Sequence, residues 1–189
     1  MRRSRYSLVL LLGLVGLSNA CSYNRLQTLD EQINTAQSQI KVQLQRRAEL
    51  IPNLVAAVKG VTKQEDTVFI QIAEARSKLA GAASGNDVAA MGQANAAMSA
   101  PLGRLLALSE NYPTLRSSES FKQLMDELAG TENRVAVART DYNGAVKEFN
   151  TKIRQFPTVI TAKVIGLGKP RPYFDLTNPD AANAPVVKF

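Results

Sequence analysis

The chain has 189 residues, and its 23 Lys and Arg against 16 Asp and Glu give a formal net charge of +7. It contains no histidine and one cysteine, which excludes an intrachain disulfide and the common zinc and Cys–His catalytic arrangements. This length suits about one domain, and no metal or other cofactor is expected.

The first 20 residues have the three-part layout of a secretory signal peptide. Arg2, Arg3 and Arg5 form a positive region, and the apolar run from Leu8 to Leu17 carries no charge. The run is shorter than the roughly 20 residues of a bilayer span, so a transmembrane anchor is the weaker interpretation. Removal of this segment would leave twenty basic and sixteen acidic residues, a net charge of +4.

Cys21 follows this segment directly, behind the small residue Ala20. The arrangement resembles the lipobox of bacterial lipoproteins, in which the cysteine is acylated and begins the mature chain. Ser18 departs from the aliphatic residue usual three places before the cysteine. We expect Cys21 to carry lipid and to hold the protein at the extracytoplasmic, periplasmic side of a bacterial membrane. Ser22, in place of an aspartate, favours the outer membrane if the organism has one, and export argues against a nucleic-acid partner.

From Tyr23 to about Gly60, apolar residues recur in steps of three and four, which predicts one long helix with a buried stripe. Pro52 lies inside this stripe and should kink the helix without ending it, because the apolar pattern continues beyond it. The proline also frees a backbone carbonyl near Ala48, which the nearby amide of Asn53 could satisfy.

A capping box at Thr62–Glu65 predicts a second helix, which the small residues of Ala80–Asp87 should end. Asn86 or Asp87 is then available to cap the next helix.

Residues 88–109 again have helical spacing, and Asn111–Pro113 should end this helix. Pro101 predicts a kink or a brief break within it, with Ser99 as a possible new cap.

Ser117 or Ser118 should cap the last long helix, whose apolar stripe runs to Ile153 in an almost unbroken seven-residue repeat. Such a helix is roughly 55 Å long at 1.5 Å per residue. Phe156–Pro157 ends it, and residues 158–166 form either a short helix or an extended segment. From Gly168 onward, four prolines and no periodicity predict an irregular, mobile tail.

These elements predict an all-α fold, an antiparallel bundle of about four helices with long first and last helices. The expected division is a signal peptide at 1–20, the bundle at 21–167 and an irregular proline-rich tail at 168–189.

Several segments of the chain resemble, in order, the LemA family of bacterial membrane-associated proteins. The likeness covers residues 23–175 and implies an antiparallel helical bundle held at the membrane by its N-terminus. It implies no established catalytic activity and no catalytic residue, cofactor or metal. Family members usually carry a transmembrane segment where this chain has Cys21, and Pro101 within a helix also looks atypical. The matching segments are Tyr23–Leu26, Gln43–Val55, Glu110–Pro113, Glu127–Arg139, Asp141–Asn143 and Ile153–Pro157.

One polar cluster flanks the apolar stripe in the middle of the last long helix. Its charges are expected to pair with polar residues of the first helix and so fix the helix register. The alternative is that both stretches form one surface for a partner protein. The residues are Glu132, Asn133, Arg134, Arg139 and Asp141 of the last helix and Arg46, Arg47 and Glu49 of the first.

No pattern in the sequence predicts catalysis. Glu127 and Glu132 are five residues apart and point in different directions on a helix, and no glycine-rich phosphate loop is present. Two functions remain: a non-catalytic scaffold or adaptor for another envelope protein, or a binding module for cell-wall polymer or an anionic lipid surface. Salt-sensitive sedimentation with peptidoglycan or anionic vesicles would separate them. The oligomeric state stays open.

Overall fold

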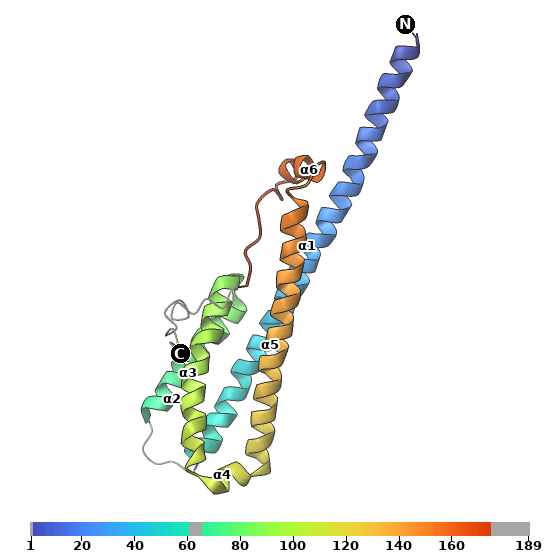
Figure 1. The fold of residues 1–189 in the computed structure, drawn as a ribbon. Coiled ribbons are helices and arrows are strands. Elements are labelled where there is room, and N and C mark those ends of the chain that lie inside the picture. Colours follow the sequence, from blue (N-terminus) through green and yellow to red (C-terminus); the bar gives the residue numbers. More distant parts are fainter. Residues whose placement is uncertain (1, 61–65, 175–189) are drawn as a thin grey trace, which may run out of the picture. The chain divides into compact units, whose positions relative to one another are not determined.

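The structure, a computed structural model, describes residues 2–60 and 66–174, and the side chains of residues 22–60 and 66–174. These residues form six α-helices and no strand, which confirms the predicted all-α class (Figure 1). As predicted, the longest helices are the first and the last long one, with 58 and 34 residues. The helices are α1 (Arg2–Lys59), α2 (Asp66–Ser84), α3 (Val88–Glu110), α4 (Pro113–Ser117), α5 (Glu119–Lys152) and α6 (Thr158–Val164).

Three predictions fall on parts that the structure does not describe. The capping box Thr62–Glu65 and the tail after Phe174 lie outside the described residues, and the side chain of Cys21 lies outside the described side chains. Among the residues that are described, no helix combines the length and the apolar character needed to cross a membrane.

The chain divides into two compact units, to which both long helices contribute. Unit 1 comprises Met1–Ala36 and Asp141–Pro172, and unit 2 comprises Gln37–Thr140 and Tyr173–Phe189.

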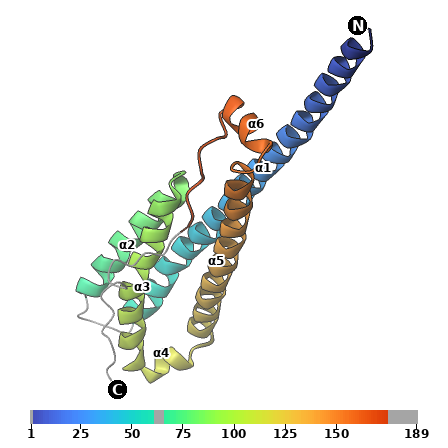
Figure 2. The same ribbon diagram turned by 45° about the horizontal axis from the view of Figure 1, so that its top comes forward.

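Unit 2 buries the apolar stripes of four helical segments. α1 and α5 are antiparallel here, because Gln43 contacts Arg134 whereas Arg46, later in α1, contacts Glu127, earlier in α5. α2 and α3 form a hairpin and lie side by side in both ribbon views (Figure 1, Figure 2). The predicted antiparallel packing is therefore present in this unit. Its core includes Ile40, Leu44, Ile51, Leu54, Val58, Ile72, Leu79, Met91, Met98, Leu102, Leu105, Phe121, Leu128 and Val135.

The predicted break at Ala80–Asp87 begins too early. α2 continues through Ser84, and only Gly85, Asn86 and Asp87 are non-helical. Alanine is the strongest helix former, and Leu79 and Ala83 are both buried one turn apart, so packing and propensity extend the helix together.

Pro101 does not interrupt α3, which is helical from Val88 to Glu110. The brief break and the new cap at Ser99 are therefore wrong. The apolar stripe continues on both sides of the proline through the buried Met98 and Leu102, and this burial holds the helix together.

Two predicted caps are present, and one helix was not foreseen. The side chain of Asp87 accepts hydrogen bonds from the backbone N–H groups of Ala89 (2.9 Å) and Ala90 (3.2 Å). Ser118 accepts one from the N–H of Phe121 at 3.2 Å and opens α5.

Between α3 and α5, the predicted stop at Asn111–Pro113 leads directly into the short helix α4, which has Pro113 at its start.

Unit 1 pairs the turns of α1 that follow Cys21 with the C-terminal end of α5. Its buried apolar side chains are Leu26, Leu29, Ile33, Tyr142, Val146, Phe149, Ile153 and Ala162. α5 ends at Lys152, four residues before the predicted end at Phe156–Pro157, and α6 confirms the helical alternative for residues 158–166.

Candidate functional site

Arg47 is the buried centre of a polar cluster in unit 2. The sequence places it on α1 next to the apolar stripe, and only 5% of the residue is exposed. Its Nη1 donates a hydrogen bond to Oδ1 of Asn95 on α3 at 2.7 Å and forms an ion pair with Glu132 on α5. We call Arg47, Asn95 and Glu132 the Arg47 cluster. It links three helices of the bundle through one guanidinium group.

Burial makes this guanidinium electrostatically costly. Desolvation lowers the pKa of Arg47 from its ordinary value, and the charge of Glu132 and the hydrogen bond to it partly oppose this shift. The buried Nε of Arg47 has no hydrogen-bond partner among the described residues. The cluster therefore holds the helices in register with one donor unsatisfied.

The carbonyl that Pro52 frees is satisfied from another helix. Pro52 lies inside α1 and lacks the N–H that would bond to the carbonyl of Ala48, four residues earlier. Nε of Arg76 on α2 donates a hydrogen bond to that carbonyl oxygen at 2.9 Å. The predicted role of Asn53 is therefore wrong, and its side chain is exposed. A guanidinium that is distant in sequence replaces the missing backbone donor.

The other predicted residues of unit 2 stay at the surface of α1 and α5. Arg46 and Glu127 approach within 4.0 Å, with 56% and 51% of their side chains exposed. Nε of Arg134 donates to Oε1 of Gln43 at 3.1 Å. Glu49, also exposed, accepts a hydrogen bond from Gln45 of its own helix at 3.3 Å.

The predicted cluster is therefore divided. Arg47 and Glu132 meet, and Arg46 lies near Glu127 instead of a predicted partner. Asn133 is exposed and Arg139 is half-buried. Asp141, exposed at the surface, belongs to unit 1.

Unit 1 contains a second polar cluster, which fixes the beginning of the predicted tail. Asn150 exchanges two hydrogen bonds with the backbone of Arg171, at 2.8 and 2.9 Å. The guanidinium of Arg171 pairs with Asp30 on α1 at 2.6 Å, and the hydroxyl of Tyr142 donates to the carbonyl of Pro172 at 3.0 Å. Residues 169–172 are irregular, as predicted, but these contacts pin them to both long helices.

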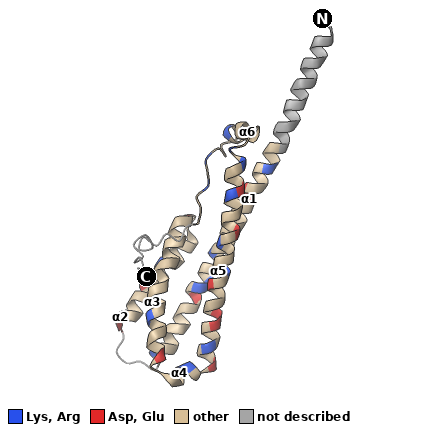
Figure 3. Cartoon of the chain, viewed as in Figure 1, with Lys and Arg blue, Asp and Glu red and all other residues tan. Residues whose placement is uncertain are grey.

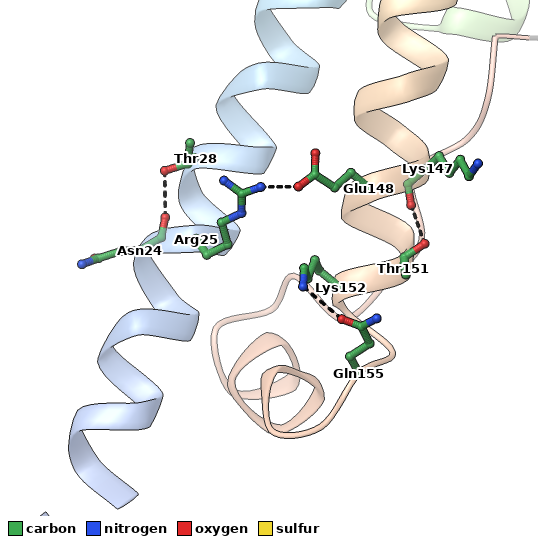
Figure 4. A network of polar contacts seen from close by, with 8 residues as sticks. All are labelled: Asn24, Arg25, Thr28, Lys147, Glu148, Thr151, Lys152 and Gln155. Atoms are coloured by element: carbon green, nitrogen blue, oxygen red, sulfur yellow. Dashed lines mark hydrogen bonds and ion pairs between the residues drawn. The ribbon is translucent and has the colours of Figure 1, made fainter. Parts of the chain in front are cut away.

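A more exposed network joins α1 to the end of α5 in the same unit (Figure 4). Arg25 forms an ion pair with Glu148, and half of the Arg25 side chain is exposed. One turn later, Lys152 donates to Gln155 at 3.1 Å, just beyond the helix. The ion pair places the end of α5 beside Arg25 of α1, which follows Cys21 by four residues.

The sequence profile of the LemA family matches residues 36–189 of the chain. The chain belongs to the LemA family. Its curated relatives include Magnetosome protein MamQ 1 and MamQ 2 of Paramagnetospirillum magneticum (strain AMB-1), each 28% identical over 188 residues, which cover 87% of this chain and 68% of the relative. Magnetosome protein MamQ of Magnetospirillum gryphiswaldense (strain MSR-1) is 26% identical over 167 residues, 76% of this chain and 61% of that protein.

Three residues with structural roles in this LemA chain were not predicted from its sequence: Arg76, Asn95 and Asn150. The sequence positions of Asn95 and Asn150 could have predicted their roles. Each lies on or beside an apolar stripe, where a polar side chain needs a buried partner. The sequence position of Arg76 could not have predicted its role, because its acceptor is a backbone carbonyl 28 residues away in the sequence.

In the described part of this LemA chain, no group of three or more His, Cys, Asp or Glu side chains is placed to hold a metal ion. Arg47 and Tyr142, whose pKa values depart from the ordinary ones, are both buried in internal contacts.

Tyr142 gives the LemA fold a pH-dependent contribution to stability. Burial raises the pKa of Tyr142 above its ordinary 10.0, and the charge of Arg171 partly opposes this shift. A raised pKa in the folded state gives stability that is complete below the unfolded pKa and is lost as pH rises through the folded one. We expect Tyr142→Phe to cost about 1 kcal/mol near neutral pH through the lost hydrogen bond to Pro172.

The difference in the free energy of unfolding between the wild type and Tyr142→Phe should shrink at high pH, because only the wild type must ionise this buried phenol. Urea unfolding of both at about pH 8 and about pH 11 measures it. A constant difference would show that Tyr142 does not titrate differently in the folded chain.

Proposed function

We propose that this chain is a non-catalytic, membrane-anchored protein of the bacterial envelope that acts as a scaffold or adaptor for another envelope protein. Membership of the LemA family and similarity to magnetosome proteins suggest a membrane-associated protein without catalytic activity. The signal-like residues 1–20 and Cys21 would supply the anchor, on the periplasmic side of the inner or outer membrane.

One observation carries the adaptor role: two adjacent arginines of α1 have different environments. Arg47 is used inside the bundle, whereas the side chain of Arg46 is 56% exposed. With Asn133 and Arg134, Arg46 forms a charged surface on α1 and α5, and the contacts that Arg46 and Arg134 make between these helices are exposed to solvent. Figure 3 shows that charged residues gather along α5 and α1, whereas α3 carries only Arg104 and Glu110. Mixed charges on paired helices give a partner electrostatic specificity.

The test reverses surface charges and leaves the Arg47 cluster intact. Affinity capture after crosslinking in envelopes should recover a partner with the wild type and lose it with Arg46→Glu/Arg134→Glu, at an unchanged melting temperature. Lys122→Glu, an exposed charge at the start of α5, is the matched control and should retain the partner. Equal recovery with all three proteins would remove this surface from the proposal. Partner loss with a large drop in melting temperature would assign these residues to the fold.

The anchor has its own test at Cys21. The wild type should fractionate with membranes and carry the extra mass of attached lipid. Cys21→Ala should lose that mass and leave the membrane fraction, whereas Ser22→Ala at the next position should behave like the wild type. Intact-mass spectrometry and fractionation measure both properties. A Cys21→Ala protein that stays membrane-bound at unchanged mass would replace the lipid anchor by a transmembrane one.

A further inference from the structure

The segment after α5 carries the most exposed large apolar side chains of the described residues. Phe156 and Val164 are each 81% exposed, and Ile160 is 53% exposed. Ile160 and Val164 are four residues apart and share one face of α6, and Phe156 lies two residues before that helix begins. Exposed apolar groups that gather in this way mark a surface that another phase or molecule covers.

The charged residues of the segment that carries these side chains have one sign, and the nearest acidic residue before it, Glu148, is paired with Arg25. Residues 149–174 contain five basic residues and no acidic one. Arg171 is paired with Asp30, and Lys152 donates to Gln155. The other three, Arg154, Lys163 and Lys169, are exposed. We call these three residues, with Phe156, Ile160 and Val164, the α6 patch. An apolar centre with a basic rim is the composition of segments that lie in the interface of anionic membranes.

The α6 patch also lies close to the anchored end of the chain. The ion pair between Arg25 and Glu148 fixes the end of α5 beside α1, and Arg25 follows Cys21 by only four residues, about 6 Å along a helix. Figure 4 shows the turn after Lys152 at the level of Asn24 and Arg25. Tyr23, 45% exposed on the same stretch of α1, is an aromatic residue of the type enriched at membrane interfaces.

We propose that the α6 patch rests on the anionic lipid surface of the membrane that holds the N-terminus, with Phe156, Ile160 and Val164 among the lipid headgroups and the three basic side chains on lipid phosphates. This inference rests on the membrane anchoring proposed above. Anchoring keeps the patch at a high effective concentration next to lipid, so a modest intrinsic affinity suffices. Contact at α6 would add a second attachment point and restrict the tilt of unit 1.

The absence of tryptophan from the chain provides a direct test. Val164→Trp in the full, anchored chain introduces a single fluorophore at the α6 patch. We expect its emission to shift to the blue and to be quenched by brominated lipid in vesicles of phosphatidylglycerol and phosphatidylcholine. Val137→Trp is the matched control, because Val137 is 62% exposed on α5 among charges of both signs, and its emission should not be quenched.

The electrostatic part is tested by charge removal. Arg154→Gln, Lys163→Gln and Lys169→Gln should each lower the equilibrium constant for the quenched state by about fivefold, and raised salt should act in the same direction. Quenching as strong in pure phosphatidylcholine as in anionic vesicles would overturn the assignment to an anionic surface.

The failure of this inference and the failure of the anchor have different readouts. If the wild type floats with vesicles while Val164→Trp remains unquenched, the anchor holds and the lipid contact at α6 is disproved. If the protein does not float at all, the membrane anchoring itself fails. If Phe156→Ser converts a dimer into a monomer in detergent, a second copy of the chain covers the patch and the lipid proposal is overturned.

Discussion

Glu132→Ala is expected to lower the free energy of unfolding by about 3 kcal/mol, at the lower end of the range for breaking a buried ion pair. The change leaves the guanidinium of Arg47 buried with the neutral Asn95 as its remaining side-chain partner in the cluster. The Glu132 side chain is 49% exposed, so water reaches part of the vacated space and keeps the cost from being larger. Chemical unfolding followed by far-UV circular dichroism measures the effect.

Removal of the arginine should cost less than removal of its carboxylate. In Arg47→Met, the half-exposed Glu132 can be solvated by water, and the methionine fills much of the space of the arginine stem. The unsatisfied Nε also disappears, but Oδ1 of the buried Asn95 loses its donor. We therefore expect a loss of about 2 kcal/mol for Arg47→Met, which is still smaller than the loss for Glu132→Ala. We also expect Arg47→Met/Glu132→Ala to be more stable than Glu132→Ala alone.

Arg46→Gln is the matched control on the adjacent residue. Its contact with Glu127 spans 4.0 Å between two exposed side chains, so its loss should change stability by less than about 0.5 kcal/mol. If Arg46→Gln and Arg47→Met had equal effects, or if Glu132→Ala were as mild as the control, the Arg47 cluster would have no role in the stability of the bundle.

The helices of this protein are largely predictable because their apolar stripes are long. In α1, Leu26, Ile33 and Ile40 are buried where the three-and-four spacing placed them. In α5, the same holds for Phe121 and Phe149 of the seven-residue repeat. Local composition was a less reliable guide to where a helix ends. Ala80–Ser84 suggested a turn, but alanine favours the helix, and Leu79 and Ala83 add buried surface to it.

The polar contacts were predictable only where a charged residue lay beside an apolar stripe or a proline lay inside a helix. Arg47 and Glu132 drew attention as charges next to a stripe, and the structure brings them together. The sequence could not show that Asn95 would join them, because that contact depends on which face of α3 packs against α1. It could show that Pro52 frees a carbonyl but not that the donor comes from α2, since Arg76 meets Ala48 only after the helices pack.

That contact between Arg76 and Ala48 leads to the second large effect. Arg76→Ala is expected to cost about 1.5 kcal/mol, because it leaves the carbonyl of Ala48, a residue only 3% exposed, without a donor. Lys78→Ala is the control, since it removes an exposed basic residue from the same helix and should stay within about 0.5 kcal/mol of the wild type.

A double-mutant cycle with Pro52→Ala shows whether the proline is the reason for this cost. Alanine at position 52 restores a backbone N–H that can bond to the carbonyl of Ala48 within α1, so Arg76→Ala should then cost less than about 0.5 kcal/mol. The coupling of about 1 kcal/mol between two residues 24 apart in sequence would identify Arg76 as the substitute for the donor that Pro52 lacks. Equal costs of Arg76→Ala in both backgrounds would instead mean that Arg76 stabilises α2 against α1 independently of the proline.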